Sequence, residues 1–214
     1  MIDGKKFDLR IYVLVTQVTP QLTAFIYKEG LARFATENYT SSANENLMMH
    51  LTNYAINKDS EKFKENEANF KWKLSAALEK IAEMEGQDKV DHLWTQIQEI
   101  CIKTLLMGLP HFQHNYKSYA CKGSAKNHHQ CFQILGFDVL LDKKLKPFLL
   151  EVNESASFND DTDVDKYVKG GLITDTFRLL NIKANSKQKI KDNQAKGLIM
   201  RNKLGHMTME EIEE

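Results

Sequence analysis

The chain has 214 residues, of which 42% are hydrophobic and 27% are charged, and its formal net charge is zero. This composition is typical of a globular domain with one sizeable core. The even charge balance predicts neither a nucleic-acid nor a membrane partner, and no apolar run approaches the roughly 18 residues of a membrane-spanning helix. Three cysteines without zinc-site spacing favour a reducing compartment over a disulfide framework.

The first part of the chain is predicted to form strands. Residues 7–18 are rich in β-branched and aromatic side chains, which indicates a buried strand. Residues 22–36 predict two short strands joined by a hairpin turn at Glu29-Gly30. The first strand comes with almost no lead, and we therefore interpret the chain as the C-terminal part of a larger catalytic unit.

The rest of the chain alternates between helices and strands. Residues 72–108 have helical periodicity, and Gly108-Leu-Pro110 is expected to end the second of two helices. Residues 131–153 predict strand, tight turn and strand, and residues 164–181 predict a helix. Mixed strands and helices place the chain in the α+β or α/β class.

Polar residues near the end of one strand, in "PFLLEVNESASF", need an explanation. Because side chains alternate along a strand, Glu151 and Asn153 share one face. The opposite face, expected to lie in the core, holds Phe148, Leu150 and Val152. With an even-membered loop around Lys143-Lys144, Asp138 would lie across from Leu149 and share the face of Glu151. An odd-membered loop would turn it away.

Two carboxylates and an amide oxygen are hard ligands that suit Mg²⁺. The alternative is structural: Asp138 caps a bend, and Glu151 pairs with a lysine on an edge strand. The hairpin alone favours neither.

Cationic residues recur in the first strands. Lys6, Asp8 and Arg10 alternate on one strand face, where they would bind anions or form a ladder of salt bridges. Arg33 lies between apolar neighbours, and a planar guanidinium there suits a carboxylate or phosphate partner. His50 alone is more typical of a core histidine than of a catalyst.

Four separated stretches resemble one known family: "GKKFDLRIYVLV", "YKEGLARFATENY", "HLTNYAINK" and "CFQILGFDVLLDKKLKPFLLEVN". In this order they are similar to the C-terminal half of the tubulin–tyrosine ligase-like enzymes, over about residues 4–182. "YKEGLARFATE" followed by "HLTNY" is most similar to the polyglutamylase branch. The resemblance implies an ATP-grasp-type fold over residues 1–182 and leaves 183–214 as a charged helical tail.

The resemblance also implies a role for each matching position. Asp138, Glu151 and Asn153 match Mg²⁺ ligands. Contacts with ATP are implied for Lys6, Asp8, Thr52 and Asn53. Arg10 matches an arginine near the γ-phosphate, with Arg33 as a second catalytic residue, and positions near the incoming glutamate are matched by Arg33, Tyr54 and Lys71.

The implied reaction is ATP-dependent addition of glutamate to glutamate side chains of the tubulin tail. The γ-phosphoryl group would pass to a tail carboxylate, and the amine of free glutamate would attack the acyl-phosphate. ATP and Mg²⁺ are the implied cofactors, tubulin or microtubules and free L-glutamate the partners, and the cytoplasm and cytoskeleton, with the cilium or basal body, the location.

Two positions depart from the family pattern. Ala156 stands where proline is usual, which loosens the loop. Glu154 would repel an acidic tail, unless it points to solvent or pairs with Lys146 or Lys169. Alternatives are therefore an inactive fragment or pseudoenzyme that acts as a microtubule-associated module, or a ligase of another amino acid or acceptor. The 214 residues alone are expected to lack ligase activity. The basic run 183–191 would bind tubulin or form a solvated helix face.

Overall fold

The computed structural model describes residues 1–39, 70–120 and 131–181. The chain divides into two compact units, Met1–Thr174 and Asp175–Glu214. All of the sheet and the residues of the site described below belong to the first unit. Within the described residues no helix is long and apolar enough to cross a membrane.

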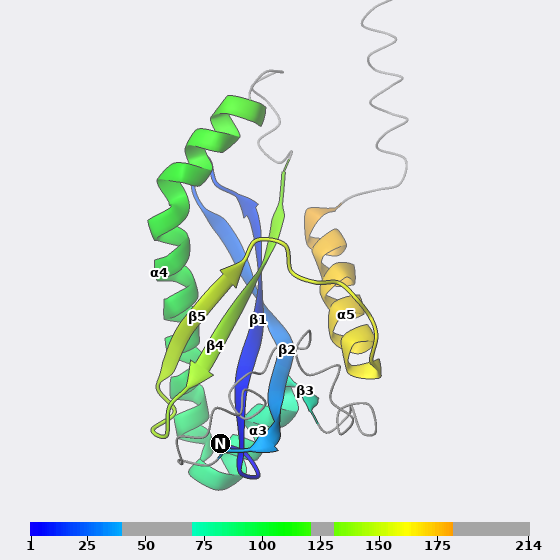
Figure 1. The fold of residues 1–214 in the computed structure, drawn as a ribbon. Coiled ribbons are helices and arrows are strands. Elements are labelled where there is room, and N and C mark those ends of the chain that lie inside the picture. Colours follow the sequence, from blue (N-terminus) through cyan, green and yellow to red (C-terminus); the bar gives the residue numbers. More distant parts are fainter. Residues whose placement is uncertain (40–69, 121–130, 182–214) are drawn as a thin grey trace, which may run out of the picture. The chain divides into compact units, whose positions relative to one another are not determined.

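The first unit is an α+β fold, as predicted (Figure 1). Its antiparallel sheet has the strand order β3-β2-β1-β4-β5, so that β3 and β5 are the edges among the described strands. The strands are β1 Lys5–Gln17, β2 Thr23–Asn38, β3 Lys71–Lys73, β4 Gln133–Leu141 and β5 Pro147–Asn153. The helices are α3 Leu74–Glu85, α4 Gln87–Ala120 and α5 Asp163–Leu180.

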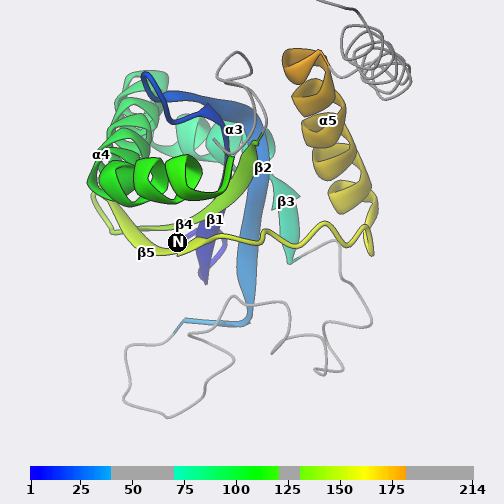
Figure 2. The same ribbon diagram turned by 90° about the horizontal axis from the view of Figure 1, so that it is seen from above.

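The alternation of side chains along β1 gives the sheet two different faces. Leu9, Ile11 and Val13 join the core that includes α3 and α4, which lie together on one side of the sheet (Figure 2). Tyr12 and Leu14 join a smaller cluster that contains Val168 and Leu172 of α5. Asp8 and Arg10 share the face of Tyr12, and both are buried.

The predicted hairpin turn at Glu29-Gly30 is wrong, because β2 continues through it. The pairing with β1 moves from Ile11↔Gly30 to Val13↔Ile26, so extra β2 residues bulge out of the ladder. Glycine is required for close approach: a Cβ on Gly30 would lie 2.4 Å from the carbonyl oxygen of Arg10.

Glu29, in this bulge, serves the start of α3. Its Oε1 accepts hydrogen bonds from the backbone N–H groups of Gly30 and Ser75, both at 3.0 Å. Its Oε2 accepts from the Ser75 hydroxyl at 2.8 Å. Ser75 is the second residue of α3, so Glu29 of β2 caps a helix that is distant from it in the sequence.

The prediction that Gly108-Leu-Pro110 ends a helix is also wrong, since α4 runs through Pro110 to Ala120. Proline removes one backbone hydrogen bond, but contacts beyond it hold the helix. Phe112 packs against the core and lies so close to Gly108 that a Cβ there would be 2.9 Å from its ring. Gln113 Nε2 also donates to the Val18 carbonyl at 2.9 Å.

The predicted hairpin at 131–153 is confirmed as β4 and β5, but its register is not the expected one. Its loop, residues 142–146, has an odd number of residues. The pairing shifts between Val139↔Leu149 and Asp138↔Glu151, which leaves Leu150 as an extra residue. The bulge cancels the effect of the odd loop, so Asp138 lies directly opposite Glu151 rather than Leu149.

The expectation that three apolar β5 side chains lie in the core is wrong. Phe148, Leu150 and Val152 are 46%, 54% and 38% exposed. β5 is an edge strand among those described, and only Pro147 in it is buried, with Leu149 packed partly against the core.

Candidate functional site

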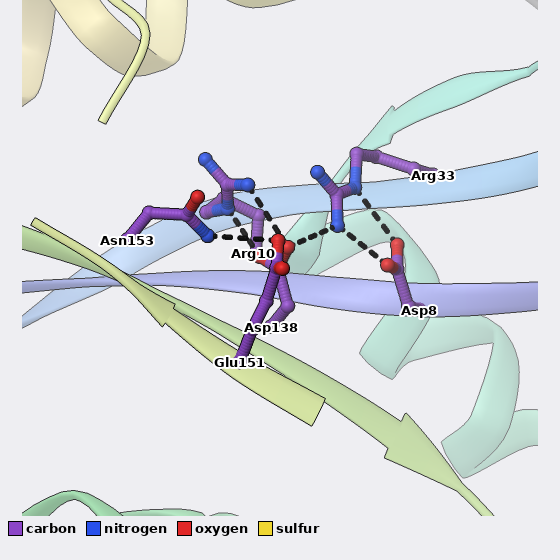
Figure 3. A network of polar contacts seen from close by, with 6 residues as sticks. All are labelled: Asp8, Arg10, Arg33, Asp138, Glu151 and Asn153. Carbon is purple, nitrogen blue, oxygen red and sulfur yellow. Dashed lines mark hydrogen bonds and ion pairs between the residues drawn. The ribbon is translucent and has the colours of Figure 1, made fainter. Parts of the chain in front are cut away.

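Four strands place the predicted charged residues on one face of the sheet (Figure 3). β1 contributes Asp8 and Arg10, β2 contributes Arg33, and β4 contributes Asp138. The register sets Asp8 beside Arg33 and Arg10 beside Asp138. Glu151 and Asn153 of β5 complete the group drawn in Figure 3.

The buried members form an ion-pair chain, Asp8–Arg33–Asp138–Arg10. Arg33 donates from Nε to Asp8 Oδ1 at 2.8 Å and from Nη2 to Asp8 Oδ2. Its Nη2 also lies 2.8 Å from Asp138 Oδ2. Arg10 donates from Nε to Asp138 Oδ1 and from Nη2 to Asp138 Oδ2, the latter at 3.0 Å. Asp8 and Arg10 therefore form salt bridges, as one of the two alternatives for this strand face expects, with partners on β2 and β4.

Burial would raise the pKa of Asp138, but the hydrogen bonds from Arg10 and the charges of both arginines outweigh it and hold the pKa below its ordinary value. Burial likewise works against charge on Arg33, and its bonds to Asp8 nevertheless raise its pKa. Asp138 and Arg33 therefore stay charged at neutral pH. Such buried pairs depend on every partner, because removing one leaves an uncompensated charge.

Glu151 and Asn153 differ from the ion-pair chain in exposure. Glu151 is exposed and Asn153 is half-buried, and Asn153 Nδ2 donates to Glu151 Oε1 at 3.0 Å. That bond turns the amide nitrogen toward Glu151 and leaves the amide oxygen pointing elsewhere (Figure 3). Asp138, Glu151 and Asn153 thus lie close together, and the two carboxylates are oxygen donors that could hold a hard cation. Within the described residues, no three His, Cys, Asp or Glu side chains gather as a metal cluster.

Gly136 is a site residue that the sequence did not reveal. It lies opposite Asn153 in the β4–β5 pair. A Cβ on Gly136 would lie 3.2 Å from Arg10 Cδ and Nη1. The absent side chain leaves room for the Arg10 guanidinium, and a glycine inside the strand "QILGFDVLL" was the available signal.

Lys71 lies beside Arg33 in the β2–β3 pair, but its side chain engages α5. Its Nζ is 2.6 Å from Asp165 Oδ2, and Lys169 Nζ is 2.8 Å from Asp165 Oδ1. Thr162 Oγ1 donates to Asp165 Oδ2 at 2.8 Å. Burial would raise the pKa of Asp165, but the bonds from the two lysines lower it. Sequence reasoning missed Thr162 and Asp165, and it named Lys169 only as an alternative partner of Glu154.

Most of the remaining predicted positions lie in segments that the structure does not describe. His50, Thr52, Asn53 and Tyr54 lie outside the described residues, as do the segment 183–214 and its basic run. Lys6 is half-buried and precedes Asp8 on β1.

Glu154 does not lie with the ion-pair chain. It lines a cavity of about 780 Å³ together with residues from α4 and from the ends of β1 and β4. Its backbone carbonyl accepts a hydrogen bond from Gln133 Nε2 at 2.5 Å. Among the described residues its carboxylate forms no ion pair with Lys146, which lies over the Phe148 ring, or with Lys169, which binds Asp165.

Fold and site together define an α+β domain whose sheet carries a charge-dense polar site beside an edge strand. The chain belongs to the tubulin-tyrosine ligase family, whose model matches residues 1–190. This confirms the resemblance drawn from the four sequence stretches.

Several curated relatives are named tubulin polyglutamylases. Human tubulin polyglutamylase TTLL6 is 47% identical over 199 residues, which are 91% of this chain and 22% of that protein. Mouse tubulin polyglutamylase TTLL13 is 46% identical over 198 residues, 89% of this chain and 24% of that protein. The probable beta-tubulin polyglutamylase of Tetrahymena thermophila is 40% identical over an alignment of 227 residues, which covers 100% of this chain and 19% of that protein. The chain thus spans less than a quarter of the length of these three relatives.

Proposed function

We propose that this chain contributes the metal- and phosphate-binding half of an ATP-dependent ligase that adds glutamate to glutamate side chains of the tubulin tail. The observation that carries the proposal is the pairing of Asp138 with Glu151 across β4 and β5, with Arg10 and Arg33 held on Asp138. The names of the relatives support the glutamylase reaction in particular.

Asp138, Glu151 and Asn153 are the proposed ligands of Mg²⁺. Their donors are two carboxylates and an amide oxygen, a set that leaves positions for nucleotide phosphate and water. When bound, the cation would neutralise phosphate charge. The cation would bind at the exposed edge of the site, where Glu151 is accessible, while Asp138 stays fixed by its arginines.

Arg10 and Lys6 are proposed to stabilise the charge that gathers as the γ-phosphoryl group leaves ATP for the tail carboxylate. The bond from phosphorus to the ADP oxygen breaks, and an acyl-phosphate forms. The glutamate amine then attacks the acyl carbon, loses a proton and expels phosphate. Positioning and electrostatic stabilisation dominate such reactions. Arg10 is prepositioned because both carboxylate oxygens of Asp138 accept hydrogen bonds from it.

Arg33, Lys71 and Tyr54 are proposed to bind the incoming glutamate, and Asp8, Thr52 and Asn53 to contact ATP. Asp8 has an additional structural task, since both of its oxygens accept from Arg33. Likewise Lys71 is held by Asp165 rather than projecting freely.

The wider context remains part of the same proposal. Residues 1–182 would belong to an ATP-grasp-type domain and 183–214 would form a charged tail. Tubulin as acceptor would place the protein with the cytoskeleton in the cytoplasm.

A second candidate is a microtubule-associated module without catalysis. It is favoured by one observation: both oxygens of Asp138 already accept from guanidinium groups, as in a purely structural ion pair. In that case a cation would find only Glu151 and Asn153.

A chimera separates the two candidates. The matching segment of human tubulin polyglutamylase TTLL6 is replaced by residues 1–190 of this chain, and incorporation of radiolabelled glutamate into microtubules is measured with ATP and Mg²⁺. The ligase proposal expects incorporation that disappears without ATP and on tubulin whose acidic tails have been removed by protease. A folded chimera without incorporation contradicts it and favours the non-catalytic module.

A further inference from the structure

The turn between β4 and β5 carries an excess of positive charge that the proposed site does not use. Residues 142–146, here called the lysine turn, read Asp-Lys-Lys-Leu-Lys. Lys143, Lys144 and Lys146 are all exposed. The turn lies where the two strands meet, at one end of the hairpin in Figure 1.

The backbone of the lysine turn is held in one arrangement. Asp142 Oδ1 accepts from the backbone N–H groups of Lys144 at 2.7 Å and Lys146 at 2.9 Å. Asp142 N donates to the Lys146 carbonyl, and Leu145 N to the Asp142 carbonyl, both at 3.1 Å. Leu145 also packs against the main core. The three lysines are therefore presented by an ordered turn whose single carboxylate faces its own backbone.

Exposed lysines on the helices behave differently. Lys80, Lys89 and Lys103 pair with Glu83, Glu85 and Glu99 at 3.0, 2.5 and 2.8 Å. Within the described part of the chain, the lysine turn has no ion pair of this kind, and Lys146 instead lies 5.2 Å from the centroid of the exposed Phe148 ring. The positive charge of the turn is thus left for a partner.

The distance from the turn to the proposed site suits a short peptide. Asp138 lies three residues before the end of β4, or about 10 Å along the strand. Glu151 lies at the same level on β5, because the pairs Leu141↔Pro147 and Asp138↔Glu151 bound the same length of the hairpin. An extended peptide of about three to five residues covers that length and reaches the turn. A side chain reacting beside Glu151 would therefore have its neighbours within reach of the three lysines.

We infer that the lysine turn binds a glutamate-rich acidic peptide, namely the residues that flank the acceptor glutamate in the substrate. This inference rests on the proposed function for the identity of that peptide. It assigns to the turn the electrostatic capture of the acceptor, and it leaves nucleotide binding and chemistry to the ion-pair chain and β5. Attraction of this kind is screened by salt.

Direct binding tests the inference without requiring catalysis. The 214-residue chain is titrated into a dye-labelled hexaglutamate peptide at low ionic strength, and fluorescence anisotropy gives the Kd. The test variant combines Lys143→Gln, Lys144→Gln and Lys146→Gln. The matched control combines Lys80→Gln, Lys89→Gln and Lys103→Gln, which removes the same charge from α3 and α4. Both variants keep the basic run 183–191, and hexaglutamine with the same dye measures uncharged binding.

The test variant should bind hexaglutamate about tenfold more weakly, which is about twofold per lysine as for exposed ion pairs, and this loss should shrink at high salt. The control should change less than twofold. Equal weakening in both variants would show a response to net charge alone and overturn the inference, as would no change in either. Circular dichroism checks that both variants fold. If the triple variant does not fold, the titration is repeated with each single lysine substitution.

Failure of the inference and failure of the proposed function can be distinguished. In the chimera, the same turn substitutions should raise KM for microtubules about tenfold and leave kcat and KM for ATP unchanged. Incorporation with an unchanged KM for microtubules would remove the turn from acceptor binding but keep the ligase. Specific hexaglutamate binding without any incorporation would keep the turn and remove the ligase.

Discussion

Asp138 is the residue on which the ion-pair chain depends, because it accepts hydrogen bonds from Arg10 and forms an ion pair with Arg33. Asp138→Asn keeps the shape of the side chain and removes its charge. Arg33 then keeps its bonds to Asp8, but Arg10 loses the carboxylate that it binds. We expect the free energy of unfolding to fall by about 3–5 kcal/mol, because a buried charge is left uncompensated. Urea denaturation measures it.

Glu151 provides the contrast at the same site. It is exposed, and its carboxylate accepts a hydrogen bond from Asn153. Glu151→Gln should therefore change the free energy of unfolding by less than about 0.5 kcal/mol. Similar stability losses in Asp138→Asn and Glu151→Gln would contradict the division into a structural chain and an accessible edge.

The lowered pKa values of Asp138 and Asp165 predict how stability depends on acid. Burial opposes their ionisation, but the arginines and lysines bound to them prevail. A carboxyl whose pKa is lower in the folded state stabilises the fold above its unfolded pKa, near 4, and this contribution is lost as pH falls from there through the lowered value.

We therefore expect the urea midpoint of the unmodified chain to drop below about pH 4 to 5. In Asp138→Asn the midpoint is lower at neutral pH, and its further fall in acid is shallower because one of the two carboxyls is gone. Parallel pH profiles for the two proteins would show that Asp138 does not contribute.

At the scale of elements, Gly30 and Gly170 form a matched pair of tests. Gly30→Ala would place a Cβ 2.4 Å from the Arg10 carbonyl oxygen, which is backbone and cannot move aside alone. We expect a loss of about 1–3 kcal/mol or more, as for overpacking. Gly170 lies exposed in α5 with nothing within 4 Å of its added Cβ. Gly170→Ala should gain about 0.5–1 kcal/mol. Thermal unfolding of both variants measures these changes. Destabilisation by both substitutions would contradict the expectation that a Cβ at Gly170 fits without a clash.

The cap on α3 gives another element-scale prediction. Glu29→Ala removes the carboxylate that accepts from the Ser75 backbone and hydroxyl. A lost helix cap costs about 0.5–2 kcal/mol, and amide hydrogen exchange should show faster opening in the first turn of α3. Unchanged exchange at Ser75 would mean that the cap contributes nothing.

Elements with a strong period could be predicted from the sequence, and their interruptions could not. β1, β4, β5 and α5 follow from runs of apolar residues and their spacing. Gly30 and Pro110 have the chemistry of a turn and a helix end. Whether they act so depends on partners distant in the chain: the Arg10 carbonyl against Gly30, and the core contacts of Phe112 and Gln113 beyond Pro110.

The site was predictable to a similar extent. The alternation of β1 and β5 placed Asp8 with Arg10 and Glu151 with Asn153. The sequence predicted that Asp138 shares the face of Glu151, but through a wrong register, because a bulge at Leu150 offsets an odd loop and neither follows from composition. The Lys71–Asp165 pair joins residues 94 positions apart, and a single sequence does not indicate such a contact.

At the scale of the whole molecule, one face of the sheet carries the main apolar core, and the other carries the ion-pair chain and the smaller apolar cluster. Leu9, Ile11 and Val13 of β1 pack in the core with α3 and α4, while Asp8 and Arg10 alternate with them toward the ion-pair chain. The same strand therefore fixes the core and the charges. The chain spans less than a quarter of the length of the three relatives compared above, and the ligase reaction is therefore a proposal.

The most direct test of the central claim compares two glutamates three residues apart in the chimera. Glu151 is the proposed metal ligand, and Glu154 lines the cavity beside α4 instead. We predict that Glu151→Gln lowers glutamate incorporation into microtubules at least about a hundredfold, as for loss of a key electrostatic group. Glu154→Gln should retain it. Incorporation that survives Glu151→Gln, with the variant folded, would contradict the metal site and the account built on it.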